Sequence, residues 1–471
     1  MRLSRLNLVV DMNKNPFASI VNLFTFSVCL AGMAALLLPT IVKRRHASRA
    51  SACSNNLRQI GLGFHNYHSA YKQLPWATGG TTGNSAPELS NGGRLGPFVG
   101  LLPFLEQQQL WEMISNPYVN PNTGQAFPPM GPVPWYAPTK YEPWGMSPEI
   151  YHCPGDGPAQ DLSSAPKTVY SLASALGSST TSNYVACYGD GTLLQAEQDA
   201  TETVFVRRRK AANRGIFKPG ERTKFRDTLD GLSYTIFFSE VVASRVRRPG
   251  SSEVIRDVIG ISKNPSLCLD AAQSGDREFW PFGRGAIWAD GFLPISGFQT
   301  ILPPNSPSCT SDLGIEDTIS SASSAHAGGV HVLMGDGSVR FASNTIDTGD
   351  LTSPGVYKQP EYLPAGAKSP YGLWGALGTR ANAEPIMETP GLVSIPRDPS
   401  TGGNSPSPKR LIRWTDKSGG ISLQAEMIQI IDQKTIQLKD ATGTLHEVPL
   451  NTLKDRDIYR AIQMDVMRRA Q

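Results

Sequence analysis

The chain has 471 residues, and its 44 Lys and Arg nearly balance 40 Asp and Glu, which leaves a formal net charge of +4. This balance gives no electrostatic argument for a nucleic-acid-binding protein, and we expect no nucleic-acid partner. With 39% hydrophobic residues and a mean hydropathy of −0.24, the chain is neither a multi-span transporter nor disordered throughout. Its 45 Gly and 37 Pro residues predict many turns and few long helices.

After an N-terminal segment over residues 1–16, an uncharged apolar run extends from Phe17 to Val42. A bilayer core needs about 20 apolar residues in helical form, so the run predicts a membrane-spanning helix over 17–42, with the lipid bilayer as its partner. The alternatives are a buried core helix and a cleaved signal peptide, whose apolar region is shorter, at about 7–15 residues.

A second helical pattern follows the basic cluster at 43–45. Apolar residues recur there at steps of three and four, which indicates an amphipathic helix. They are Leu57, Ile60, Phe64, Tyr67 and Tyr71. We therefore expect one long helix that continues from the membrane into a folded domain, as in a type IV pilin or pseudopilin.

Several ordered motifs follow along the chain. They are LLPFLEQQQL at 101–110, YHCP at 151–154, DTLDGLSYT at 227–235 followed by Glu240, RGAIWADG at 284–291, LPPNSPSC at 302–309, and His326 ten positions before Asp336-Gly337. Over roughly residues 35–384 the chain resembles the prepilin-like bacterial envelope proteins of unknown function that end in an H-x9-DG motif. The resemblance implies a pseudopilin-like, β-rich domain over 43–384 that is exported from the cytoplasm.

The N-terminus departs from that family. The family's cleavage site places a Gly at the cut and a Glu early in the apolar run, whereas this chain has Asn15-Pro16-Phe17 and no such Glu. We therefore expect the N-terminus to be retained.

The motif residues have two interpretations. As structural residues, the Asp-Gly pairs form tight turns, because Gly supplies the positive φ that such turns require. As a functional site, His326, His331 and Asp336 carry competent metal ligands, and the Gly-Asp-Gly loops could hold calcium, although the D-x-D-x-D-G spacing is missing. We favour structural roles, with no metal and no cofactor, for His326, Asp336, Gly337, Asp227, Asp230, Gly231 and Glu240.

The six cysteines include no C-x-x-C pair. If the domain is exported, Cys268 and Cys309 are the candidates for a disulfide; free buried thiols are the alternative.

The end of the chain changes character. Residues 385–409 are rich in Pro, Ser and Gly and predict a linker, and residues 410–471 contain four or five alternating segments that predict a small antiparallel barrel. Residues 411–460 resemble the homology-one domain of Sla-type endocytic adaptors, an SH3-like fold. This resemblance makes Trp414 a candidate peptide-binding residue; a structural spacer is the alternative.

The predicted fold class is therefore α+β, with a membrane-spanning helix, a long helix packed on a β-rich domain, and an SH3-like barrel. The expected function is that of a non-enzymatic, membrane-anchored surface or envelope protein. It would mediate interaction or assembly with unidentified envelope proteins or with further copies of itself. We place most of the chain outside the cytoplasm, although the Lys and Arg count around residues 17–42 favours the opposite topology. A metal-dependent binder or enzyme with a site near His326 and Asp336 is the alternative.

Overall fold

The computed structural model describes residues 16–83, 86–137, 139–156, 180–192, 211–243, 252–275, 277–280, 282–311, 317–382, 384, 391–394, 412–415, 422–431, 435–440 and 444–453. The chain divides into two compact units, Met1–Ile395 and Pro396–Gln471. Residues 1–15, and with them the question of N-terminal processing, lie outside the described residues, as does most of the predicted linker.

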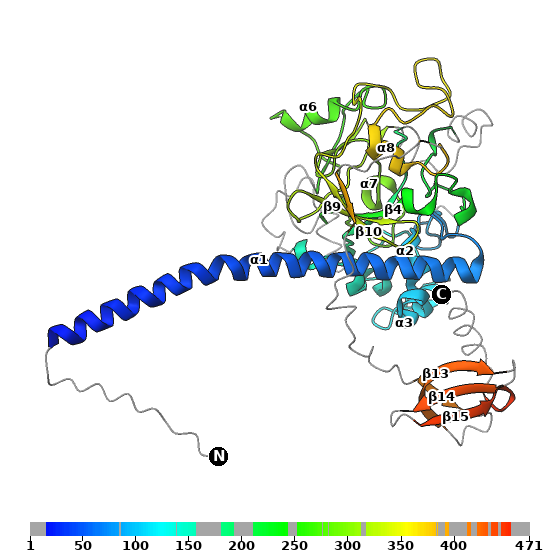
Figure 1. Ribbon diagram of the computed structural model, residues 1–471. Coiled ribbons are helices and arrows are strands. Elements are labelled where there is room, and N and C mark those ends of the chain that lie inside the picture. Colours follow the sequence, from blue (N-terminus) through cyan, green and yellow to red (C-terminus); the bar gives the residue numbers. More distant parts are fainter. Residues whose placement is uncertain are drawn as a thin grey trace. The chain divides into compact units, whose positions relative to one another are not determined.

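Helix α1 (Pro16–Tyr71) is continuous, and its C-terminal half packs against the rest of the first unit (Figure 1). Its buried residues Cys53, Leu57, Ile60 and Phe64 repeat at steps of three and four, so one face of the helix enters the core. Tyr71, at the end of the predicted stripe, is 55% exposed.

The prediction of a membrane-spanning helix is wrong on this structure. Within the part of the chain that the structure describes, no helix is both long and apolar enough to cross a bilayer. From Arg44 onward, the described side chains of α1 combine basic and polar residues with the buried stripe, which is the pattern of a helix packed on a domain.

A six-stranded sheet organises the first unit, with the strand order β11-β10-β9-β4-β3-β6. Its strands are β3 (Tyr184–Cys187), β4 (Ile236–Glu240), β6 (Gly297–Phe298), β9 (Gly329–Met334), β10 (Val339–Ser343) and β11 (Leu392–Ser394). All neighbours are antiparallel except β3 and β6.

Both faces of this sheet are covered. Successive side chains of a strand point to opposite faces, and those of β3 enter two different hydrophobic cores. Tyr184 and Ala186 of β3 belong to the core that contains the buried residues of α1. Val185 and Cys187 belong to a second core with Trp374 of α8 (Gly372–Gly378).

Smaller elements surround the sheet. A three-stranded sheet consists of β5 (Val254–Ile255), β7 (Ser308–Thr310) and β8 (Thr318–Ile319), and β1 (Tyr118–Val119) pairs with β2 (Ala126–Phe127). The remaining short helices are α2 (Pro97–Leu101), α3 (Gln108–Ser115), α6 (Leu267–Gln273) and α7 (Leu293–Ser296). The 3-10 helices are η1 (Leu102–Leu105), η2 (Glu142–Gly145), η3 (Glu149–Tyr151), η4 (Pro154–Asp156), η7 (Phe225–Asp227), η8 (Leu232–Tyr234) and η9 (Leu450–Thr452).

The predicted SH3-like barrel is the second error in the fold class. Strands β12 (Ile412–Thr415), β13 (Ser422–Ile431), β14 (Thr435–Asp440) and β15 (Leu445–Pro449) form an antiparallel sheet in sequence order. Among the described strands, β12 and β15 do not pair, so the sheet does not close. The fold is therefore mixed α/β with several sheets and no closed barrel.

Candidate functional site

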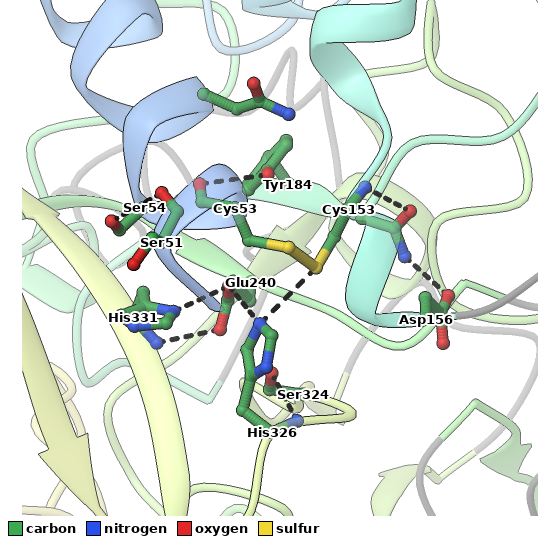
Figure 2. A network of polar contacts seen from close by, with 12 residues as sticks. Ser51, Cys53, Ser54, Cys153, Asp156, Tyr184, Glu240, Ser324, His326 and His331 are labelled. Carbon is green, nitrogen blue, oxygen red and sulfur yellow. Dashed lines mark hydrogen bonds and ion pairs between the residues drawn. A yellow bond between two sulfur atoms is a disulfide. The ribbon is translucent and has the colours of Figure 1, made fainter. Parts of the chain in front are cut away.

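The end of β4 places a carboxylate inside the protein. The strand reads IFFSE and is buried at every position, and Glu240 is only 1% exposed. The register pairs Ser239 with Val332 of β9, which brings Glu240 beside His331. The backbone N–H of His331 donates to Oε2 of Glu240 at 2.8 Å, and Nδ1 of the same residue lies 2.8 Å from Oε1 (Figure 2).

His326 is the second imidazole on this carboxylate. Its Nε2 lies 3.3 Å from Oε1 of Glu240, and the rings of His326 and His331 meet edge to face with centroids 5.0 Å apart. Burial alone would raise the pKa of the Glu240 carboxyl, but the hydrogen bonds and charges of the two histidines outweigh burial and lower its pKa to about 2. Glu240 is therefore ionised at neutral pH.

A disulfide adjoins the histidine pair. Cys53 of α1 is bonded to Cys153, which directly precedes η4. Nε2 of His326 lies 3.4 Å from Sγ of Cys153. Gly155 makes this approach possible, because a Cβ there would lie 2.5 Å from Cε1 of His326 and 3.2 Å from Sγ of Cys153. A larger residue at 155 would push the imidazole away from the disulfide.

Buried polar residues hold the disulfide in place. The backbone N–H of Cys153 donates to Oδ1 of Asn183 at 3.0 Å, and Nδ2 of Asn183 donates to Oδ2 of Asp156 at 2.6 Å. On the other side, the hydroxyl of Tyr184 donates to the carbonyl of Cys53 at 3.1 Å. Asn183, Asp156 and Tyr184 thus fix the backbone of both cysteines.

A cavity of about 590 Å³ opens beside the two histidines. Residues 47–54, on successive turns of α1, form one wall. Residues 325–327, just before β9, contribute to the other wall. The lining residues are Ala47, Ala50, Ser51, Ser54, Ala325, His326, Ala327, His331 and Phe341. Its volume lies within the ~300–1,000 Å³ range of small-molecule sites.

Of the residues predicted from the H-x9-DG and DTLDGLSYT motifs, the structure brings His326 and Glu240 together. Asp336 and Gly337 lie in the turn between β9 and β10, where Gly337 has a φ of +83°. The exposed carboxylate of Asp336 accepts hydrogen bonds from the N–H and hydroxyl of Ser338, so its contacts lie within the hairpin turn.

The remaining predicted residues have partners of their own. Asp227 accepts the backbone N–H of Lys224 at 2.8 Å, and Gly231 adopts a φ of +94°. Asp230 accepts the backbone N–H of Asn382 at 2.9 Å. Cys268 and Cys309 form a disulfide in the structure. The side chain of Trp414 lies outside the described residues.

Sequence reasoning missed the Cys53–Cys153 pair and the role of His331. The signals were present, since Cys153 lies in the YHCP motif and Cys53 lies on the amphipathic helix. Nothing in their spacing links two cysteines that are 100 positions apart.

The two aspartates of the motifs should differ in their effect on stability. We expect Asp230→Ala to lower the free energy of unfolding by about 1–3 kcal/mol, because the backbone N–H of Asn382 loses its partner. Asp336→Ala should cost less than about 1 kcal/mol, because water can replace an exposed acceptor. Urea unfolding at an unchanged m-value measures both, and a larger loss for Asp336→Ala would contradict the assignment.

The fold and this cluster define a mixed α/β protein whose long N-terminal helix is joined by a disulfide to the segment before η4, beside a buried Glu240 and its two histidines. A family model described as "Protein of unknown function (DUF1559)" matches residues 43–349. This match covers well over half of the chain, which therefore belongs to that family. No curated protein and no solved structure matches the chain. The match names neither the H-x9-DG motif nor an SH3-like domain, and it assigns no activity.

Proposed function

We propose that this protein is a non-enzymatic binding protein that captures the carboxylate end of a partner protein in the cavity beside His326 and His331. The observation that carries the proposal is that one ring nitrogen of His331 is bound by Glu240 and the other is left for a ligand. Its Nδ1 is engaged by Glu240, no described residue hydrogen-bonds its Nε2, and its side chain lines the cavity. Nε2 is thus a polar group available to a ligand.

The composition of the cavity supports an anionic ligand with an apolar side chain. The lining residues include four alanines and Phe341 and no acidic residue. The exposed side chains of Arg44, Arg45 and Arg49 lie on the adjacent turns of α1 and add positive charge. An apolar C-terminal residue would bury its side chain here while its carboxylate meets the imidazoles.

A binding role also fits the serine residues of the wall. The Ser54 hydroxyl donates to the carbonyl of Ser51 at 3.0 Å, within the helix, and among the described residues no hydrogen bond joins it to His331, as a nucleophile and its base would require. Nε2 of His331 donates to a carboxylate ligand when the ring carries a proton on both nitrogens, because Nδ1 is already held by Glu240. The charged and titratable groups that face it are Glu240 and His326.

Calorimetric titration of the full, oxidised chain tests the proposal. We expect peptides that end in Leu or Phe with a free carboxylate to bind, and amidation of that end to weaken binding roughly 10–100-fold, since a charge-assisted hydrogen bond is lost. N-acetyl-leucine distinguishes a protein end from a free small molecule and should bind more weakly than the peptides.

A matched pair of substitutions on one helix provides the control. Ala47→Trp should abolish peptide binding by filling the cavity, whereas Ala70→Trp, at an exposed position outside it, should leave binding unchanged. Equal binding of free and amidated peptides, or an Ala47→Trp variant that binds normally, would rule out this function.

A further inference from the structure

Four potential metal ligands meet at the disulfide. Sγ of Cys53, Sγ of Cys153, a carboxylate oxygen of Glu240 and a ring nitrogen of His326 all lie within 4.8 Å of one another. We propose that reduction of the Cys53–Cys153 disulfide turns this cluster into a binding site for a zinc-like divalent cation, and that the disulfide keeps the site closed to metal.

The distances in the oxidised protein already approach those of a tetrahedral site. Zinc binds thiolate at about 2.3 Å and imidazole or carboxylate at about 2.0–2.2 Å, which places tetrahedral ligand atoms roughly 3.3–3.8 Å apart. Nε2 of His326 lies 3.3 Å from Oε1 of Glu240 and 3.4 Å from Sγ of Cys153. Nε2 of His326 therefore already lies at ligand-to-ligand distance from two of the other atoms, whereas the two sulfur atoms, bonded at 2.04 Å, have to separate.

The ligand types also favour zinc. Two thiolates, an imidazole and a carboxylate form a mixed sulfur, nitrogen and oxygen set, which is suited to zinc and poorly suited to magnesium or calcium. Cys53, Cys153 and Glu240 are buried and His326 is half-buried, and four protein ligands make a closed site of the structural kind. His326 lies in the wall of the 590 Å³ cavity, which gives the cation a route of entry.

Residues around the four ligands would hold them in place. The backbone N–H of His331 donates to Oε2 of Glu240, which leaves Oε1 facing His326. Outer hydrogen bonds of this kind orient metal ligands.

The switch follows from thiol chemistry. The thiolate is the form of cysteine that binds metal, and the sulfur atoms of a disulfide are not thiolates. A dithiol reductant attacks one sulfur to form a mixed disulfide, and its second thiol then closes a cyclic disulfide and releases both protein thiols. The dithiol is oxidised, the protein gains two electrons and two protons, and metal binding releases those two protons.

Cobalt(II) titration of the full chain tests this inference. A phosphine reductant is used because, unlike a dithiol, it does not compete strongly for the metal. We expect the oxidised chain to bind no stoichiometric cobalt. The reduced chain should bind one equivalent with thiolate-to-cobalt charge-transfer bands and the ligand-field bands of four-coordinate cobalt.

Substitutions and chemical protection locate the site. His326→Ala should weaken cobalt binding by more than roughly tenfold, and Cys268→Ser/Cys309→Ser, which removes the other disulfide, should leave it unchanged. In the unsubstituted reduced chain, cobalt should protect Cys53 and Cys153 from alkylation but not Cys268 and Cys309. This readout does not depend on a cysteine variant that folds.

Three results would overturn the inference: no cobalt bound after reduction, equal binding with the disulfide intact, or protection of Cys268 and Cys309 instead. The outcome is independent of the peptide titrations, which use the oxidised chain, so failure of one proposal leaves the other standing.

Discussion

Replacing both Cys53 and Cys153 by serine is expected to lower the free energy of unfolding by about 4–5 kcal/mol. The disulfide joins α1 to the segment before η4 across a sequence separation of 100. In the chain-entropy model, closing a loop of about 100 residues in the unfolded chain is worth about 4.7 kcal/mol. Both partners are buried and fixed by Asn183 and Tyr184, so the native state keeps the two sulfur positions together.

Urea unfolding under non-reducing conditions measures this loss, and the second disulfide provides the comparison. Cys268 and Cys309 are separated by 41 positions, for which the same model gives about 4 kcal/mol. We therefore expect Cys268→Ser/Cys309→Ser to be slightly less destabilising. A loss below about 1 kcal/mol for Cys53→Ser/Cys153→Ser would show that the bridge does not stabilise this fold.

Glu240→Ala is expected to cost about 3–5 kcal/mol at neutral pH. Removing this carboxylate leaves the backbone N–H and the imidazole of His331, together with His326, without their acceptor inside the protein. Breaking a buried charged pair from one side has a cost of this size. Glu240→Gln keeps an acceptor oxygen and loses only the charge, so its cost should be smaller, at about 1–3 kcal/mol.

The contribution of Glu240 also has a defined pH dependence. The pKa of this carboxyl falls from 4.5 to about 2 in the folded protein. Its ionised form therefore stabilises the fold fully above about pH 5, and this contribution, on the order of 3 kcal/mol, is lost as the pH falls from 5 towards 2. The difference in unfolding free energy between the unsubstituted chain and Glu240→Gln should shrink over that range.

Urea unfolding at pH 7, 5 and 3 checks this dependence. Glu112→Gln, at an exposed position on α3, is the control and should stay within about 0.5 kcal/mol of the unsubstituted chain. A Glu240→Gln deficit that stays constant from pH 7 to pH 3 would mean that the two histidines do not hold this carboxylate in its ionised form.

Sequence patterns were informative where the structure depends on neighbouring residues. The step of three and four at Leu57, Ile60 and Phe64 predicted a buried helix face, and all three side chains are buried. The Asp-Gly pair at 336–337 predicted a tight turn, and Gly337 adopts the positive φ that such a turn requires. Both features are local, because one helical turn or one hairpin is sufficient to produce them.

Patterns that depend on distant partners were less informative. Alternating segments in residues 410–471 predicted strands, but alternation does not indicate whether the first and last strands pair. In the structure, β12 and β15 are not hydrogen-bonded to each other. Likewise, the length of the uncharged run at 17–42 suggested a bilayer crossing, which the described residues do not support. Strand closure and the surroundings of a helix are properties of the whole molecule.

The sequence by itself therefore determined the amphipathic face of α1 and the turns, since these follow from the spacing of nearby side chains. Only the tertiary structure decided the site. Glu240 meets His331 across 91 positions, and His326 meets Cys153 across 173. The β4–β9 register and the packing of α1 on the sheet create these contacts, and no local pattern specifies them, because each depends on where the chain folds back on itself.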